Sequence, residues 1–331
     1  MMKTVTGGLK YFNEVALIRG KQLGMDAVLL NRPPLWGKDE WSEKAVQWMV
    51  DYCAKFGMII AGVENIPVEW FTPIVLNYPE RDECIERYLR IITAFGKAGI
   101  PYLGYGFAAG NVWRTDLAAK GRGGCRCMQY VKADENTKGN QLVYKNVIHG
   151  EMPSREELWN NYAYFLKAVL PHAEKEHVGL MLHPSDPPLP VVHGVPRIFC
   201  SIEDYKYAYE LSGHSPAWGL NLCLGCISQM GGKDAVLEMI RYFGPKGKIF
   251  QVHLRDVIGS GESFTECFLG EGNYNPAQVL CELENCGFNG YVFEDHVPMI
   301  HDDDGYHTIG RAHAVGYIQG MIDMMKYLIK K

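Results

Sequence analysis

The sequence predicts a (β/α)8 barrel. Along its 331 residues, eight short apolar runs of strand type alternate with eight longer segments of helical period. Strict alternation of strand and helix is typical of a parallel sheet, and eight repeats favour closure of that sheet into a barrel. A doubly wound open sheet is the competing fold. It usually carries a glycine-rich phosphate turn after its first strand, and Gly7-Gly8-Leu9 does not form that motif.

Each expected element is an apolar or periodic run bounded by turn residues. The expected strands are 4–7, 26–30, 58–64, 102–107, 179–183, 218–223, 249–255 and 291–295. The expected helices are 11–23, 41–56, 80–97, 155–177, 202–211, 234–243, 276–286 and 310–329.

Capping residues support the helix boundaries. Ser154 and Glu157 form a capping box, and Asn275-Pro276 places an N-cap residue before a proline at the first helical position. Four glycines directly follow expected helices, where a left-handed cap is favoured: Gly24, Gly57, Gly99 and Gly287.

The chain contains no linker rich in proline, glycine or serine, so one domain is expected over residues 1–331. The stretch 111–151 is polar and glycine-rich and follows the fourth expected strand. We expect it to be an extended loop on the catalytic face of the barrel or a lid over that face.

Composition excludes several classes of function. The net charge is −5 and the basic residues form no stripe, which argues against a nucleic-acid partner. No apolar run approaches the ~18 residues of a membrane span, and residues 1–20 lack the apolar core of a secretion signal. The ten cysteines are scattered, as reduced thiols are in cytosolic enzymes. A cytoplasmic protein is therefore expected, and the sequence leaves a homo-oligomer open.

Metal-ligand residue types end four consecutive expected strands: His183, Cys223, His253 and Asp295. The chemistry of such barrels lies at these strand ends, and buried polar groups there are costly unless something satisfies them. One shared divalent cation would satisfy all four. A thiol, two imidazoles and a carboxylate suit Mn²⁺, Fe²⁺, Co²⁺ or Zn²⁺ better than Mg²⁺ or Ca²⁺. Cys226 competes for the thiolate role, and Cys223 is preferred because it is nearer to the strand.

Two arginines indicate an anionic substrate. Arg255 follows His253 by two residues and so faces the same side of its strand, and Arg114 follows the fourth strand. A guanidinium group is the usual partner of a carboxylate. The alternative is pairing within the protein, Arg255 with Asp256 or Glu266 and Arg114 with Asp116.

At these residues the sequence resembles the mannonate dehydratase family. The matching motifs are GVENIPV (62–68), WRTDL (113–117), HPSDPP (183–188), GVPRI (194–198), GLNLC (219–223) and VHLRDV (252–257). The resemblance implies a xylose isomerase-like barrel that uses Mn²⁺ to dehydrate D-mannonate to 2-keto-3-deoxy-D-gluconate in hexuronate breakdown. Its ligands would be the same four strand-end residues. Four further residues in these motifs are predicted to bind the sugar acid: Glu64, Arg114, Asp186 and Arg255.

The chain departs from the family in two places near the predicted site. Asp295-His296-Val297-Pro298 stands where the family has Asp-His-Gly. The tyrosine often found just before Arg311 is absent, and Ile309-Gly310 takes its place.

Dehydration removes the proton next to a carboxylate and expels the hydroxyl from the following carbon. His296 is the predicted acid/base, since an imidazole moves protons near neutral pH, but it faces the pocket only if the chain turns before Pro298. Arg255 would anchor the anion. Tyr306 and His313 are the weaker candidates for protonating the leaving hydroxyl.

Two other functions are open at this point. One is a metal-dependent sugar isomerase or epimerase, with Glu64 and Glu294 as its acid/base pair. The other is a non-catalytic sugar-acid binding protein, although four ligand types at one rim exceed what binding alone requires.

Overall fold

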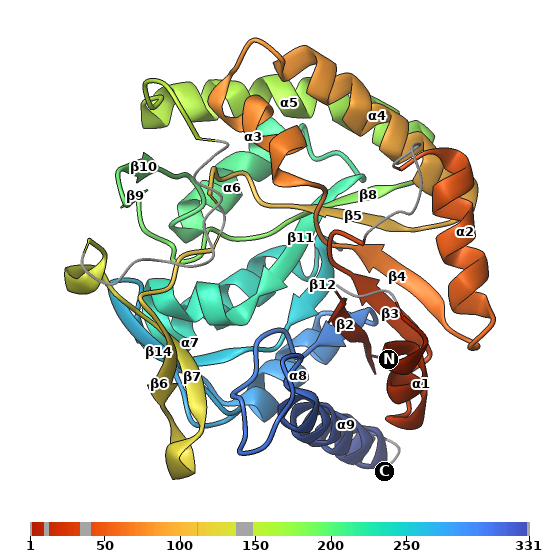
Figure 1. Cartoon of the computed structure of the whole chain (residues 1–331), viewed down its shortest axis with the longest axis vertical. Helices are drawn as coiled ribbons and strands as arrows, with labels where there is room; N and C mark the ends of the chain where they lie inside the picture. The colour runs from red at the N-terminus through yellow and green to blue at the C-terminus, as the bar shows by residue number, and fades with distance from the viewer. Residues whose placement is uncertain (1, 10–12, 34–40, 111, 137–147, 330–331) are drawn as a thin grey trace.

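The computed structural model describes residues 2–9, 13–33, 41–110, 112–136 and 148–329 (Figure 1). Its main sheet has the strand order β1-β15-β12-β11-β8-β5-β4-β3-β2, and all of its pairs are parallel. These strands are β1 (Lys3–Thr4), β2 (Thr6–Leu9), β3 (Ala27–Leu30), β4 (Ile59–Val63), β5 (Tyr102–Tyr105), β8 (Gly179–Leu182), β11 (Trp218–Cys223), β12 (Ile249–His253) and β15 (Tyr291–Phe293).

The N-terminal segment closes the barrel. β1 pairs with β15 and β2 pairs with β3, while only Val5 separates β1 from β2. Both ends of the strand order therefore lie on one short piece of chain, and the sheet forms a ring with eight positions. Gly7 permits this course, because a Cβ at Gly7 would lie 2.6 Å from Cε2 of Phe293. The predicted (β/α)8 barrel is confirmed.

Alternating strand residues divide the core into two parts. Ala27 and Leu29 of β3 lie in a small cluster with apolar residues of other strands, inside the barrel. Val28 and Leu30 point the other way and join the large cluster between the sheet and the helices.

The helices surround the sheet, as Figure 1 shows. They are α1 (Glu14–Gln22), α2 (Glu43–Ala54), α3 (Val68–Leu76), α4 (Arg81–Ala98), α5 (Arg155–Lys175), α6 (Ile202–Leu211), α7 (Leu224–Phe243), α8 (Pro276–Asn285) and α9 (Thr308–Ile329). The predicted caps are confirmed: Ser154 and Glu157 form a capping box, and the Asn275 side chain accepts from the first-turn amides of α8. The four predicted glycine caps have φ of 82°, 65°, 71° and 82°: Gly24, Gly57, Gly99 and Gly287. Residues 11–12, where the first helix was expected to begin, lie outside the described residues.

Two helices differ from the prediction. α3 is absent from it, and α7 begins at Leu224 rather than at residue 234. Residues 71–76 of α3 and 224–229 of α7 are buried without interruption, so neither segment shows the polar face that reveals a surface helix. Gly232, with φ of 64°, kinks α7 between its buried and its amphipathic halves.

The described residues of the predicted connection 111–151 contribute two strands to a second sheet. β6 (Asp116–Lys120) and β7 (Arg126–Val131) join β13 (Asp256–Ser260) and β14 (Ser263–Cys267) in an antiparallel sheet of order β13-β14-β7-β6. The strand predicted over 249–255 accordingly ends at His253. This sheet connects the segments that follow β5 and β12, beside α7 (Figure 1). Residues 111 and 137–147 of the predicted loop lie outside the described residues.

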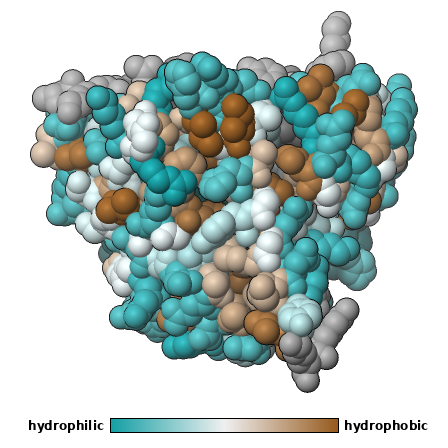
Figure 2. Space-filling model, turned by 90° about the horizontal axis from the view of Figure 1, so that it is seen from below, coloured by the Kyte–Doolittle hydropathy of each residue, from teal (hydrophilic) through white to brown (hydrophobic). Residues whose placement is uncertain are grey.

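Smaller elements complete the chain. They are the short helices Arg122–Gly124 and Lys132–Asp134 and the hairpin β9 (Val191–Val192) and β10 (Val195–Pro196). On the face seen in Figure 2, hydrophobic residues form separate patches between hydrophilic ones, as on an ordinary water-exposed surface. Within the described residues, every helix is too short or too polar to cross a membrane.

Candidate metal centre

The register of the barrel brings the predicted ligands to one rim. Cys223 ends β11 and His253 ends β12, and the two residues pair directly. His183 follows β8, and Asp295 follows β15, whose Phe293 pairs with His253. Because the C-terminal ends of parallel strands meet at one face of a barrel, four strands place four ligand types around one region.

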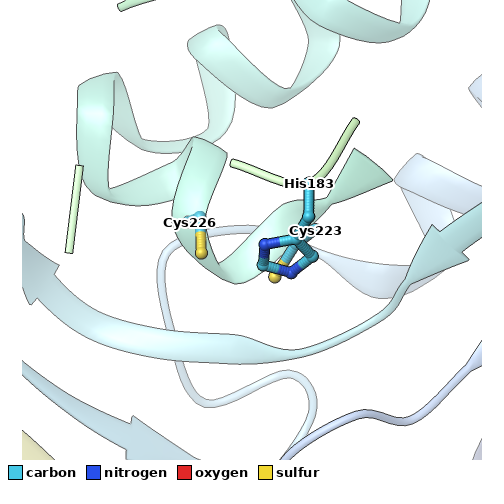
Figure 3. Close-up of side chains that lie close together, drawn as sticks. All are labelled: His183, Cys223 and Cys226. Atoms are coloured by element: carbon cyan, nitrogen blue, oxygen red, sulfur yellow. The ribbon is translucent and has the colours of Figure 1, made fainter. Parts of the chain in front are cut away.

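The possible ligand atoms form two overlapping groups, in each of which all atoms lie within 4.8 Å of one another. The first group is Cys223, His253 and Asp295, and the second is His183, Cys223 and Cys226 (Figure 3). In the first, Oδ2 of Asp295 lies 3.8 Å from Sγ of Cys223 and 3.6 Å from Nδ1 of His253. Cys223 belongs to both groups and Cys226 to the second alone, so the preference for Cys223 as the thiolate ligand stays a prediction.

Both histidines are held by the ring nitrogen that faces away from the cluster. Nδ1 of His183 lies 2.8 Å from the carbonyl oxygen of Pro184, and Nε2 of His253 lies 2.7 Å from Oε1 of Glu64. Metal-binding histidines are usually fixed in this way by a carbonyl or a carboxylate. Glu64 therefore contacts the His253 ring, and its predicted contact with substrate stays a prediction.

One buried nitrogen supports a cation at this place. Nδ1 of His253 is buried and has no hydrogen-bond partner among the described residues, although unpaired buried nitrogens are costly. It faces the Asp295 carboxylate and the Cys223 sulfur. Two imidazoles, sulfur and a carboxylate form a donor set that fits a transition-metal ion.

The charges around the cluster agree with that fit. Burial alone would lower the pKa of His253, but the Asp295 and Glu64 carboxylates raise it well above its usual value. Burial alone would raise the pKa of Cys223, but contacts with Cys226 and Arg255 and with both imidazoles lower it well below its usual value. The region therefore attracts positive charge and favours the thiolate form of Cys223, which is the ligand form of cysteine.

A Glu64→Ala variant is expected to weaken metal affinity by roughly 10- to 100-fold, because His253 loses the carboxylate that orients its ring. Metal titration of the chelator-treated protein measures this change. Glu69→Ala, on the exposed face of α3, is the matched control and should leave the affinity unchanged. Unchanged metal affinity with a higher KM in Glu64→Ala would instead place Glu64 at the substrate.

The predicted turn after β15 is present. β15 ends at Phe293, and Asp295 has φ of 50°, in the left-handed region that few non-glycine residues adopt. This turn brings both Asp295 and His296 to the rim, where Nε2 of His296 lies 3.7 Å from Oδ1 of Asp295.

A buried cluster of ion pairs lies directly behind the ligands. Arg114 binds Asp186 at 2.8 Å and Glu266 at 2.7 Å, and its side chain is fully buried. Arg255 binds Asp186 at 3.0 Å and Glu266 at 3.1 Å. Of the internal pairings considered on sequence, Arg255 with Glu266 is present. Arg114 pairs with Asp186 and Glu266, and its pairing with Asp116 stays a prediction.

This arrangement changes the view of three predicted substrate-binding residues. Arg114, Asp186 and Arg255 contact one another in the interior, with side chains no more than 3% exposed. They hold the site from behind, and a direct contact with substrate stays a prediction. Burial would raise the pKa of Asp186, but both arginines lower it far below its usual value, so it is ionised.

Glu266 of β14 is a site residue that was considered on sequence only as a partner of Arg255. Its Oε1 lies 2.9 Å from Nδ1 of His296. Burial would raise the pKa of Glu266, but His296 and Arg114 lower it to about 2. Burial would lower the pKa of His296, but Asp295 and Glu266 raise it. The second sheet thus supplies the carboxylate that fixes the predicted acid/base.

The other predicted acid/base residues, Tyr306 and His313, have different surroundings. The Tyr306 hydroxyl donates to the carbonyl oxygen of Gly7, and burial raises its pKa to about 12. The Arg311 guanidinium lies 4.5 Å from the centre of the Tyr306 ring. His313 is exposed on α9, edge-on to Phe268, and lines a small pocket together with His296.

The backbone at Gly310 explains why no tyrosine stands directly before Arg311. A Cβ at Gly310 would lie 2.4 Å from the carbonyl oxygen of Pro298, so this backbone accepts no side chain there. Pro298 belongs to the segment that replaces the family's Asp-His-Gly, so the two departures seen in the sequence contact each other and accommodate each other.

Comparison with known proteins identifies close counterparts of this chain. The family model described as D-mannonate dehydratase (UxuA) matches residues 8–331. A mannonate dehydratase of Thermotoga maritima is 30% identical in an alignment that covers 86% of this chain and 88% of that protein.

Solved structures agree with the sequence comparison. The mannonate dehydratase of Streptococcus suis serotype 2 superimposes with a TM-score of 0.83 at 27% identity, covering 97% of this chain and 94% of the other. An L-ribulose 3-epimerase superimposes with a TM-score of 0.63 at 16% identity, covering 100% and 97% of the two chains. The second likeness shows the barrel fold alone.

Proposed function

This chain belongs to the D-mannonate dehydratase family, and from that premise we propose that it removes water from D-mannonate to give 2-keto-3-deoxy-D-gluconate. The observation that carries the proposal is the rim cluster of His183, Cys223, His253 and Asp295, at the strand ends of a chain matched by the family over residues 8–331. The likeness to epimerases extends only to the barrel.

We propose that these four side chains hold a divalent transition-metal ion, with Mn²⁺ implied by the resemblance and Fe²⁺, Co²⁺ or Zn²⁺ as alternatives. When bound, such an ion supplies Lewis-acid stabilisation of the negative charge that develops on the substrate carboxylate. The buried Nδ1 of His253, which has no hydrogen-bond partner among the described residues, and the lowered pKa of the Cys223 thiol support this assignment.

His296 is the proposed group for proton transfer. Its side chain is 25% exposed, whereas that of Arg255 is 1% exposed. Nδ1 of His296 donates to Glu266 at 2.9 Å, with Nη1 of Arg255 also 2.9 Å away, so Nε2 is the atom left to exchange a proton with substrate. Arg255 is proposed to position His296 and Asp295.

Removal of the C2 proton must be matched by protonation of the C3 hydroxyl as it leaves. Tyr306 and His313 are proposed as sources of that second proton. The placement of His313 in one pocket with His296 supports it, and the buried hydroxyl of Tyr306 beside Arg311 supports the other candidate.

The reaction is tested by product mass. Purified protein supplied with Mn²⁺ is expected to convert D-mannonate to a 2-keto-3-deoxy acid that is lighter by one water. An isomerase or epimerase would give a product of unchanged mass, and a binding protein would be stabilised by the sugar acid without turnover. Either of those results contradicts the proposed dehydration.

A further inference from the structure

Cys226 lies beside the predicted ligands without having a role in the proposed reaction. It is the third residue of α7, and Cys223 is the N-cap of the same helix. Residues three apart lie on one side of a helical turn, so the two side chains are neighbours. Their sulfur atoms and a ring nitrogen of His183 lie within 4.8 Å of one another, and both cysteines are buried (Figure 3).

Cys226 has one cationic neighbour, although burial and the hydrogen bond with Cys223 raise the pKa of its thiol well above the usual value. Nη2 of Arg255 donates to Sγ of Cys226 at 3.1 Å. The sulfur also lies in the first turn of α7, where the helix dipole and the free amides favour an anion.

Gly225 provides the space for this contact. A Cβ at Gly225 would lie 2.4 Å from Nε of Arg255, so only glycine lets the guanidinium approach this turn of α7. The arginine that pairs with Asp186 and Glu266 thus also contacts the second sulfur.

We propose that Cys226 is a second sulfur ligand of the metal ion, which gives a donor set of His183, Cys223, Cys226, His253 and Asp295. This inference rests on the proposed metal site. On binding, a metal–sulfur bond forms, the S–H bond of Cys226 breaks, and the proton passes to solvent. Two thiolates favour softer ions, so this site binds Zn²⁺, Fe²⁺ or Co²⁺ in preference to Mn²⁺.

Cobalt titration of the chelator-treated full chain tests the proposal, because thiolate ligands give Co²⁺ a charge-transfer absorption. The Cys226→Ser variant is expected to lose about half of the wild-type absorption at saturation, since one of two thiolates is removed. It should also bind Zn²⁺ more weakly by roughly tenfold or more, while its affinity for Mn²⁺ changes little. Cys281→Ser, an exposed cysteine of α8, is the matched control and should match wild type.

The outcomes separate this inference from the proposed function. Full cobalt absorption in Cys226→Ser with loss in Cys223→Ser overturns the second sulfur and leaves the dehydratase proposal intact. No cobalt binding by the wild-type protein overturns the metal site itself. X-ray absorption of the zinc-loaded wild-type protein provides a measurement that does not depend on a variant folding. Two sulfurs at about 2.3 Å support the proposal, and one sulfur contradicts it.

Discussion

A His183→Ala variant is expected to lose bound metal and to lower kcat/KM for D-mannonate by roughly a thousandfold or more. Metal stabilisation of the substrate's developing charge contributes several kcal/mol, and about 4 kcal/mol corresponds to a thousandfold in rate. His183 is held by the Pro184 carbonyl, so its other nitrogen is fixed toward Cys223, and no other described side chain replaces it at that position. Metal analysis of the purified variant and the keto-acid assay measure both effects.

The control is His301→Ala, which removes an imidazole that is 95% exposed and should keep metal and activity. The scheme fails if His183→Ala keeps full activity, or if protein stripped of metal by a chelator converts D-mannonate at the wild-type rate. Returning metal to the stripped wild-type protein should restore activity, and returning it to the variant should not.

The rim ligands could be predicted because their positions depend on local order along the chain. Each ligand stands at or just after an apolar run, and parallel strands in a barrel bring such positions to one face. Pro298 also predicted a turn, which the structure has at Asp295 and which brings His296 to the rim. The closeness of the Cys223 and Cys226 sulfurs could not be predicted. Residues 224–229 are buried throughout and show no helical period that would place Cys226 beside Cys223.

The second sheet could not be predicted because its pairing is non-local. The Gln129 side chain donates to Thr265 at a separation of 136 residues, and Arg114 contacts Glu266 at a separation of 152. Nothing in either segment alone identifies the other as its partner. Asp186 and Glu266 are likewise far from Arg114 in the sequence, so they could not be predicted as its partners. Arg114 was therefore interpreted as a group that binds a substrate carboxylate.

A Glu266→Ala variant is expected to lower the free energy of unfolding by about 3–5 kcal/mol, because it leaves buried positive charge without its partner. Glu266 accepts from Arg114 and Arg255, whose side chains are 0% and 1% exposed, so water cannot take its place readily. The catalytic rate should fall by roughly 10- to 100-fold, since His296 loses the carboxylate that holds its Nδ1. Urea unfolding and steady-state kinetics measure the two effects.

Two further variants test whether Glu266 acts through its negative charge or through its position beside His296. Glu262→Ala, on the same hairpin, removes an exposed ion pair with Lys132 and should change the free energy of unfolding by no more than about 1 kcal/mol. Glu266→Gln keeps a hydrogen-bonding oxygen near His296 but removes the negative charge shared by the arginines. If Glu266 acts through position, Glu266→Gln should recover most of the lost kcat while remaining less stable than wild type. If Glu266→Ala unfolds like Glu262→Ala and keeps its kcat, the second sheet takes no part in holding His296, and the turn at Asp295 alone must orient that ring.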